Sequence, residues 1–167
     1  ELLRCFPEES RGKTTVIHNC VDGSYRPGPE SGDDAALASV GLERGRYFLA
    51  VGTVEPRKNY QLLIEAVRTG RWPVPLVVVG GHGWHAESAA SELRDLERYG
   101  RVRWLQNVPH GSLAALYRGC SAFFYPSRYE GFGMPPVEAL ACGARAVVAD
   151  HPVFREVLGS CAIFLVR

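Results

Sequence analysis

The sequence predicts an α/β fold with an open parallel sheet of about six strands and helices on both faces. Two observations carry this prediction. Short uninterrupted apolar runs such as Leu76-Val-Val-Val recur along the chain, and amphipathic helical patterns such as residues 86–99 separate them. Strands that are apolar throughout are buried on both faces, and a parallel sheet between two helix layers provides that burial.

The composition narrows the class of protein. The chain has 167 residues, 46% of them hydrophobic and 22% charged, with a formal net charge of +1, which is typical of one globular domain and gives no sign of a nucleic-acid partner. No apolar run approaches the ~20 residues that span a bilayer. Five scattered cysteines argue against a disulfide framework. We therefore expect a cytoplasmic protein, with peripheral attachment to the inner face of the membrane as an open alternative.

The first 45 residues differ from the rest. They contain a β-branched run at residues 14–17, then a Gly-, Pro- and Ser-rich stretch over residues 22–45. We expect residues 1–45 to be an interdomain segment and the start of the domain, with a mobile loop and a weak helical turn. Residues 46–167 are expected to form the sheet domain. Because the chain starts without Met and stops within a predicted strand, we expect a piece cut from a longer protein, truncated at its C-terminus.

The apolar runs predict six strands, at residues 47–51, 76–79, 102–105, 122–125, 146–149 and 162–166. Helical patterns lie between them, one of them capped by Asn59. In open parallel sheets, ligands bind at the carboxyl ends of the strands. Three loops follow strands there, at residues 52–59, 80–85 and 127–133, so they can share one ligand.

The most informative stretch is Ser127-Arg-Tyr-Glu-Gly-Phe-Gly-Met-Pro-Pro-Val-Glu-Ala-Leu-Ala-Cys-Gly. Glu130 and Glu138 flank a Gly-Phe-Gly turn that opens a short helix, whose free N–H groups suit a phosphate. Glu138, about two turns into the helix, can accept hydrogen bonds from ligand hydroxyls. Alternatively, Glu130 caps the helix and Glu138 is a solvated helix residue. The apolar neighbours of Glu138 favour a partner for its carboxylate.

A second stretch reads Gly52-Thr-Val-Glu-Pro-Arg-Lys-Asn, after the first sheet strand. Gly52 lets a ligand approach the backbone, and Arg57 and Lys58 place two cations suited to a diphosphate. The alternative is an ordinary solvated basic surface. The glycine spacing matches neither the P-loop nor the dinucleotide-binding fingerprint, which counts against an ATPase or a dehydrogenase.

Other polar residues offer weaker candidates. His82 and His85 lack a third ligand nearby, so a loop surface is expected rather than a metal site. Asp150 and His151 are adjacent in sequence, so they are not expected to form a catalytic dyad. The aromatic residues of the strands, including Phe123 and Tyr125, are expected to pack in the core.

Together, these two stretches and the Val77-Val-Val-Gly-Gly turn resemble the retaining glycosyltransferases of the GT-B fold, family 4. The resemblance is to their carboxyl-terminal, donor-binding domain and covers roughly residues 14 to 165. It implies a Rossmann-like domain that forms the C-terminal half of a GT-B fold. The Glu-Pro-Arg-Lys-Asn and Gly-His-Gly-Trp blocks look most like bacterial mannosyltransferases of surface polysaccharide synthesis.

The resemblance implies roles for matching residues. Arg57 and Lys58 correspond to the basic pair that grips the donor diphosphate, and Glu130 lies near the hydroxyls of the transferred sugar. Glu138 corresponds to the residue that holds the ribose hydroxyls. The residues implied in donor binding are Gly52, Arg57, Lys58, Gly80, Val108, Glu130, Gly131, Phe132, Gly133, Met134 and Glu138, and those implied in catalysis are Glu130, Arg57 and Lys58.

The resemblance also implies the reaction. The expected donor is a GDP- or UDP-sugar such as GDP-mannose, the acceptor a saccharide or lipid-linked saccharide bound by a separate N-terminal domain, and no metal is expected. This chain alone is expected to bind the donor but not to catalyse transfer. A non-catalytic nucleotide-binding module and a GT-B relative such as a sugar-nucleotide epimerase stay open as alternatives.

Overall fold

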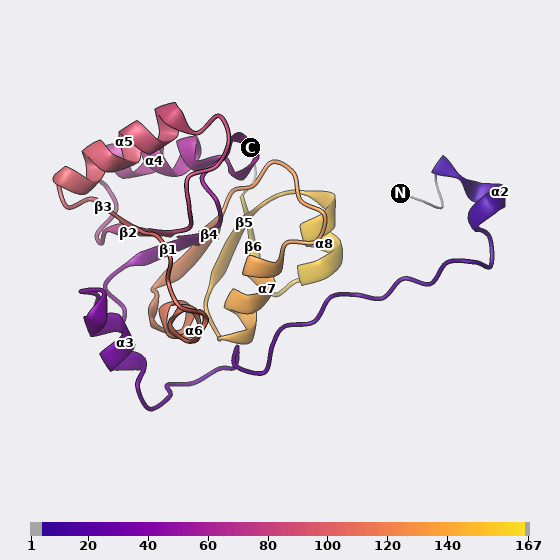
Figure 1. Ribbon diagram of the computed structural model, residues 1–167, viewed down its shortest axis with the longest axis horizontal. Coiled ribbons are helices and arrows are strands. Elements are labelled where there is room, and N and C mark those ends of the chain that lie inside the picture. The colour runs from indigo at the N-terminus through magenta and orange to yellow at the C-terminus, as the bar shows by residue number, and fades with distance from the viewer. Residues whose placement is uncertain (1–4, 166–167) are drawn as a thin grey trace.

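The computed structural model describes residues 5–165, which contain a six-stranded, fully parallel sheet (Figure 1). The strands are β1 (Phe48–Val51), β2 (Leu76–Val79), β3 (Val102–Leu105), β4 (Ala122–Tyr125), β5 (Ala146–Ala149) and β6 (Ile163–Leu165). Each predicted strand is confirmed to within a residue or so at either end. Val166, the last residue of the sixth predicted strand, lies outside the described residues.

The strand order is β3-β2-β1-β4-β5-β6. The chain therefore builds outward from β1 through β3, then returns to the other side of β1 to add β4, β5 and β6. At such a reversal the loops after the two central strands diverge, and the crevice between them is where ligands bind in doubly wound sheets. Here these loops are residues 52–59 after β1 and residues 126–133 after β4.

Helices cover both faces of the sheet (Figure 1). One face carries α4 (Tyr60–Arg68) and α5 (Glu87–Arg98), which pack over the β1–β3 half. The other face carries α3 (Asp33–Ser39), α6 (His110–Gly119), α7 (Met134–Ala141) and α8 (Pro152–Leu158). A short 3-10 helix, η1 (Pro56–Lys58), precedes α4.

The core consists of two layers because successive strand residues point to opposite faces. Leu49 of β1 and Phe123 of β4 belong to the layer beneath α6 and α7, and both are fully buried. Ala50 and Val78 belong to the opposite layer, beneath α4 and α5. The layer under α7 is rich in aromatic residues, and the candidate site lies at its edge.

The N-terminal segment has two parts. Residues 11–20, which follow α2 (Pro7–Ser10), have exposed side chains and run away from the sheet, and the β-branched run at residues 14–17 forms no strand (Figure 1). Residues 22–45 return to the body and contain α3, which is longer than the single weak turn expected. Tyr25, Leu37 and Leu42 of this stretch are buried in the core.

A buried ion pair fastens this stretch to α6. Arg118 Nη2 lies 2.6 Å from Asp33 Oδ1, and the two side chains are 4% and 3% exposed. Arg44 adds a longer contact to Asp33, at 3.4 Å. The hydrogen bond from Arg118 is the main reason that the pKa of Asp33 is lowered from 3.8 to about 2.

The N-termini of α4 and α7 can be compared with the predicted helix starts. Asn59 occupies the N-cap position of α4 but makes no capping bond; its backbone is left-handed (φ 56°) and its side-chain amide donates to the carbonyl of Pro126, at 3.3 Å. Asn59 thus ties the loop after β1 to the loop after β4. In α7 the two prolines occupy the first turn as predicted, and Gly133 at the N-cap has φ 90°.

We predict that Gly80→Ala destabilises the fold by about 3 kcal/mol or more. Gly80 has φ +150°, and a Cβ there would lie 2.2 Å from the carbonyl oxygen of Gly52. Gly81→Ala is the matched control, because a Cβ at Gly81 meets no atom within 4 Å. Urea unfolding of both variants measures the difference; equal stabilities would contradict the close approach of the two loops.

We also predict an acid-labile contribution from Asp33. Its folded pKa lies below the unfolded value, so the ionised carboxylate stabilises the fold above pH ~4, and this stabilisation is lost as the pH falls toward 2. Between pH 5 and pH 2 the wild-type chain should lose about 2 kcal/mol more unfolding free energy than Asp33→Asn. The control is Asp34→Asn, whose parent side chain is 85% exposed and which should lose as much unfolding free energy as the wild type between pH 5 and pH 2.

Candidate functional site

A cluster of donors surrounds one oxygen of Glu130 where the loops after β1 and β4 meet. Lys58 Nζ lies 2.6 Å from Glu130 Oε1, and Arg57 Nη1 lies 2.9 Å from it. The hydroxyls of Ser127 and Tyr125 lie 2.7 Å and 2.9 Å from the same oxygen. The structure therefore brings Glu130 together with Arg57 and Lys58, which precede it by more than 70 residues in the sequence.

The backbone holds these two loops in register. The Arg57 carbonyl accepts a hydrogen bond from the N–H of Arg128, at 2.7 Å, and lies 3.0 Å from the Ser127 hydroxyl. Together with the bond from Asn59 to Pro126, these contacts fix the β1 loop against the β4 loop. The position of the cations relative to Glu130 is therefore set by backbone as well as by side chains.

The two cations differ in burial. Lys58 has a side chain only 9% exposed, and its ammonium donates to both Tyr125 and Glu130, which leaves one of its three N–H bonds. Arg57 is 40% exposed and contacts Glu55 as well, with Nε 2.5 Å from Glu55 Oε1. That Glu55 oxygen is buried, yet no donor among the described residues is aligned for a hydrogen bond to it. Arg57 is thus the less constrained of the two.

Burial alone raises the pKa of the Glu130 carboxyl, but the hydrogen bonds from Lys58, Ser127 and Tyr125 outweigh it. The pKa of Glu130 consequently lies below its usual value, and the group is an anion at neutral pH. Among residues 5–165, no hydrogen bond reaches its other oxygen, Oε2. One oxygen of Glu130 is saturated, while the second has no donor within the described part of the chain.

Several glycines lie in the loops next to this cluster. Gly52 and Gly80 end β1 and β2 and lie in contact, and Gly52 also packs against the Lys58 side chain. Gly133 lies against the ring of Phe154 in α8, where a Cβ would come within 2.6 Å of the ring. At Gly131, by contrast, a Cβ would meet no atom within 4 Å, so its backbone borders open space.

The start of α7 has fewer free donors than an ordinary helix. Pro135 and Pro136 carry no N–H, so of the first four backbone groups only Gly133 and Met134 can donate. Phe132 and Met134 are half-buried, and the Phe132 ring meets His18 edge-on, with centroids 5.9 Å apart. Val108, after β3, is half-buried against the core layer under α6.

Glu138 lies apart from the cluster of cations. It is half-buried in α7, and its Oε2 accepts a hydrogen bond from the hydroxyl of Tyr117 in α6, at 2.9 Å. No hydrogen bond to its Oε1 occurs within residues 5–165. The bland alternative, a solvated helix residue, does not describe Glu138, since one of its oxygens is bound to a buried tyrosine.

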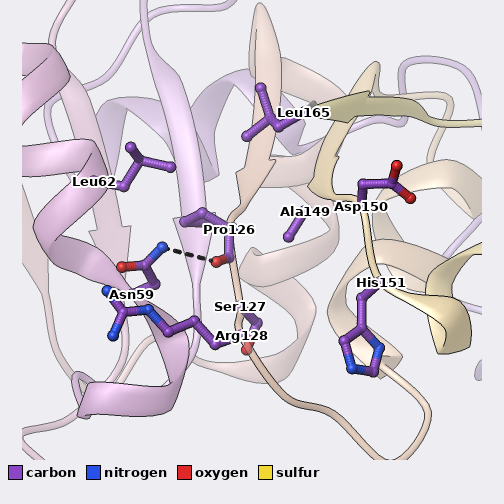
Figure 2. Close-up of a pocket in the computed structure, with 9 residues that line it drawn as sticks. All are labelled: Asn59, Leu62, Pro126, Ser127, Arg128, Ala149, Asp150, His151 and Leu165. Carbon is purple, nitrogen blue, oxygen red and sulfur yellow. Dashed lines mark hydrogen bonds between the residues drawn. The ribbon is translucent and has the colours of Figure 1, made fainter. Parts of the chain in front are cut away.

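A cavity of about 250 Å³ lies beside the cluster, between the ends of β4, β5 and β6 (Figure 2). Asn59, Ser127 and Arg128 line one side of it, and Asp150 and His151 the other. None of Lys58, Glu130 and Glu138 lines this cavity. This cavity is therefore separate from the two glutamates.

Several sequence candidates take no part in the site. His82 and His85 are exposed, and within the described part of the chain no group of three or more His, Cys, Asp or Glu side chains is arranged to hold a metal ion. Asp150 pairs with Arg155, while His151 caps α8 through its ring nitrogen, so the two bind different partners. No helix within residues 5–165 is long and apolar enough to cross a membrane.

Sequence reasoning missed four residues that hold the site: Tyr125, Ser127, Tyr117 and Glu55. Tyr125 is packed in the core as predicted, at 3% exposure, but its hydroxyl reaches the site. Ser127 is a buried polar residue three positions before Glu130. Its nearness in sequence to Glu130 was the available indication that the two side chains interact. No comparable sequence signal exists for Tyr117, because it lies on a different helix from Glu138.

We predict that Glu130→Gln destabilises the fold by about 3 kcal/mol, because it leaves the buried Lys58 ammonium without its anion. Adding Lys58→Met should restore part of that loss, since the unpaired charge is then removed. Urea unfolding measures both, with the exposed Glu156→Gln as control. If Glu130→Gln were as stable as the control, the carboxylate would not be what fastens the two loops.

Comparisons with known proteins agree with this architecture. Residues 35–162 match the family model described as glycosyl transferases group 1. The chain is 38% identical over 123 residues to the O-antigen chain mannosyltransferase RfbU of Salmonella typhimurium, and 36% identical over 167 residues to O-antigen chain mannosyltransferase B of Escherichia coli. The matches cover 74% and 98% of this chain, but only 35% and 44% of these two relatives.

Solved structures share the fold. The C-terminal domain of a glycosyl transferase group 1 family protein, LpcC from Francisella tularensis, matches 87% of this chain and 80% of its own, with a TM-score of 0.69 and 16% identity. HepE of Anabaena in complex with UDP and glucose matches 90% of this chain and 42% of its own, with a TM-score of 0.76 and 21% identity. The chain belongs to the glycosyl transferases group 1 family, as a domain with the fold of their C-terminal half.

Proposed function

We propose that this chain is the domain of a glycosyltransferase that binds the nucleotide-sugar donor. The observation that carries the proposal is the meeting of Arg57, Lys58 and Glu130 at the strand-order reversal, beside the glycine-lined start of α7. A donor diphosphate carries negative charge, and its sugar and ribose carry hydroxyls. The site offers cations for the first and carboxylates for the second.

The geometry supports one assignment of roles within the site. Arg57, half-exposed, is the group that reaches the diphosphate, and the free N–H groups of Gly133 and Met134 supplement it. Lys58 keeps Glu130 ionised and in place. The second oxygens of Glu130 and Glu138 accept hydrogen bonds from the sugar and the ribose, respectively. Gly131 and Phe132 complete the loop around the sugar.

The bond to the leaving diphosphate breaks as negative charge grows on its oxygens. A guanidinium and a helix N-terminus aimed at those oxygens lower that barrier. No step here requires a metal ion. Gly52, Gly80 and Val108 border the nucleoside end of the donor in this proposal.

The identity of the donor is the finer part of the proposal. Several similar proteins are O-antigen mannosyltransferases, which favours mannose and thus GDP-mannose. HepE, which shares the fold, was solved with UDP and glucose, so UDP-sugars are the second choice. We further propose that the acceptor, a saccharide or lipid-linked saccharide, is bound by another part of a longer parent protein. This chain alone would then bind donor without transferring sugar, in the cytoplasm or at the inner face of the membrane.

Donor binding predicts a rise in melting temperature. At a ligand concentration about 100 times Kd the stabilisation is about 2.7 kcal/mol, or roughly 5–10 °C for a domain of this size. GDP-mannose, UDP-glucose, GDP and UDP should be compared by scanning fluorimetry. Glu138→Ala should abolish the shift produced by the best ligand, whereas Glu156→Ala on the exposed side of α8 should keep it.

The shift rather than the absolute melting temperature is the readout, since Glu138→Ala also removes the acceptor of the Tyr117 hydroxyl. If none of the four nucleotides shifts the wild-type melting temperature, the chain does not bind a donor. Product analysis with the full-length parent then tests the reaction: a glycoside product supports transfer, and an epimerised sugar nucleotide would overturn it.

A further inference from the structure

Each of the two glutamates is held by a buried tyrosine hydroxyl. Tyr125, at the end of β4, lies with its hydroxyl 2.9 Å from Glu130 Oε1. Tyr117, in α6, lies with its hydroxyl 2.9 Å from Glu138 Oε2. The two tyrosines are 3% and 0% exposed, so each hydroxyl meets its glutamate from inside the core.

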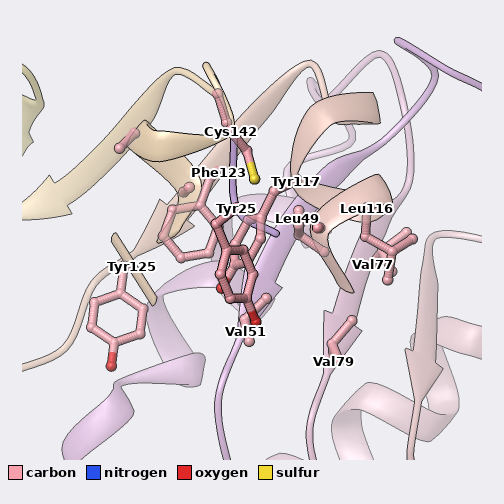
Figure 3. Close-up of a cluster of buried hydrophobic side chains, with 14 of the residues drawn as sticks. Tyr25, Leu49, Val51, Val77, Val79, Leu116, Tyr117, Phe123, Tyr125 and Cys142 are labelled. Atoms are coloured by element: carbon pink, nitrogen blue, oxygen red, sulfur yellow. The ribbon is translucent and has the colours of Figure 1, made fainter. Parts of the chain in front are cut away.

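One row of aromatic rings carries both tyrosines (Figure 3). The Tyr117 ring meets the edge of Phe123, with centroids 5.4 Å apart, and Phe123 stacks on Tyr125 at 5.8 Å. Tyr25 and Phe154 close the two ends of the row, at 6.0 Å and 5.8 Å. Packed rings of this kind do not change rotamer without displacing their neighbours. The hydroxyls therefore have fixed positions relative to each other.

Both hydroxyls remain donors at any physiological pH. Burial raises the pKa of Tyr117 and of Tyr125 well above the usual value, and the neighbouring glutamates raise it further. A buried hydroxyl needs an acceptor, so rotating either carboxylate away would leave one unsatisfied. Each carboxylate is thus held with one oxygen toward its tyrosine. Its second oxygen has no protein donor among residues 5–165.

We propose that Tyr117 and Tyr125 are positioning residues that aim the second oxygens of Glu138 and Glu130 at the ligand. This inference rests on the proposed function. Tyr117 sets recognition of the ribose hydroxyls through Glu138, and Tyr125 sets recognition of the sugar through Glu130. Because Phe123 separates the tyrosine rings, one rigid row fixes the spacing between the two parts of the donor.

The test is a comparison of affinity ratios by calorimetry. The ligands are GDP and UDP, their 2′-deoxy forms, GDP-mannose and UDP-glucose, and the variants are Tyr117→Phe and Tyr125→Phe. Tyr117→Phe should reduce the preference for ribose over 2′-deoxyribose at least threefold, about the effect of one net hydrogen bond. Tyr125→Phe should leave that preference unchanged and reduce the gain in affinity that the sugar provides.

Tyr47→Phe is the matched control. Tyr47 is equally buried in the same core layer, but its hydroxyl donates to the backbone carbonyl of Leu116, at 2.7 Å. It should lose stability without altering either ratio. If Tyr117→Phe keeps the wild-type ribose preference, or if Tyr47→Phe lowers it equally, the positioning role is wrong.

A ligand-free measurement separates this inference from the proposed function. Carboxyl NMR of the wild type and Tyr125→Phe should show a higher pKa for Glu130 in the variant, because a donor to the ionised form is lost. An unchanged pKa overturns the role of Tyr125 even when donor binds. Failure of the wild type to bind any of the nucleotides instead overturns the proposed function, whatever the NMR result.

Discussion

The ionised carboxylate of Glu130 is the interaction on which the site depends. Its Oε1 receives donors from both loops that flank the strand-order reversal: Arg57 and Lys58 after β1, and Tyr125 and Ser127 around the end of β4. The crevice of a doubly wound sheet exists because these loops diverge. In this chain the Glu130 carboxylate ties the two loops together close to the ends of β1 and β4.

The close packing of these loops explains two local departures from ordinary backbone geometry. Asn59 stands in a left-handed conformation at the start of α4 and uses its side chain to hold Pro126 rather than to cap the helix. Gly80 and Gly52 come into backbone contact that no side chain would permit. Asn59 joins the loop after β1 to the loop after β4 in place of capping α4. Gly80 allows the loop after β2 to contact the loop after β1.

The sheet could be predicted from sequence because its signal is local. An apolar run such as Val77–Val79 identifies a strand without knowledge of its neighbours, and the motifs around Arg57 and Glu130 identify a family. Alternation with helices predicts parallel strands, whereas their order was not predicted and comes from the structure. What could not be predicted was the environment of each polar group. Lys58 was expected to act on a donor diphosphate together with Arg57, but no sequence pattern indicated that its ammonium is buried between Tyr125 and Glu130.

The tyrosines show the same limit more sharply. Tyr117 lies 21 residues before Glu138, on another helix, and only the packing of α6 against α7 brings the two together. In sequence, Tyr125 was interpreted as a core residue and Tyr117 was not singled out; both are buried. Their hydroxyls account for a small part of each side chain, so patterns based on hydrophobicity cannot detect them.

Charge balance finally explains why the two cations do not have the same task. Without ligand, Arg57 and Lys58 face Glu55 and Glu130, so the cluster is neutral. A diphosphate entering such a site competes with carboxylates for its cations. Lys58 is buried and bound to both Tyr125 and Glu130, and releasing it would take the shorter of two ion pairs, at 2.6 Å, from a buried anion. Arg57 is half-exposed and touches Glu55 without an aligned hydrogen bond. Its pair with Glu130 Oε1, at 2.9 Å, is one of four contacts to that oxygen, so Arg57 is the cation that turns toward a ligand at the smaller cost. If a diphosphate binds here, the site responds through Arg57 while Lys58 and Glu130 keep the geometry.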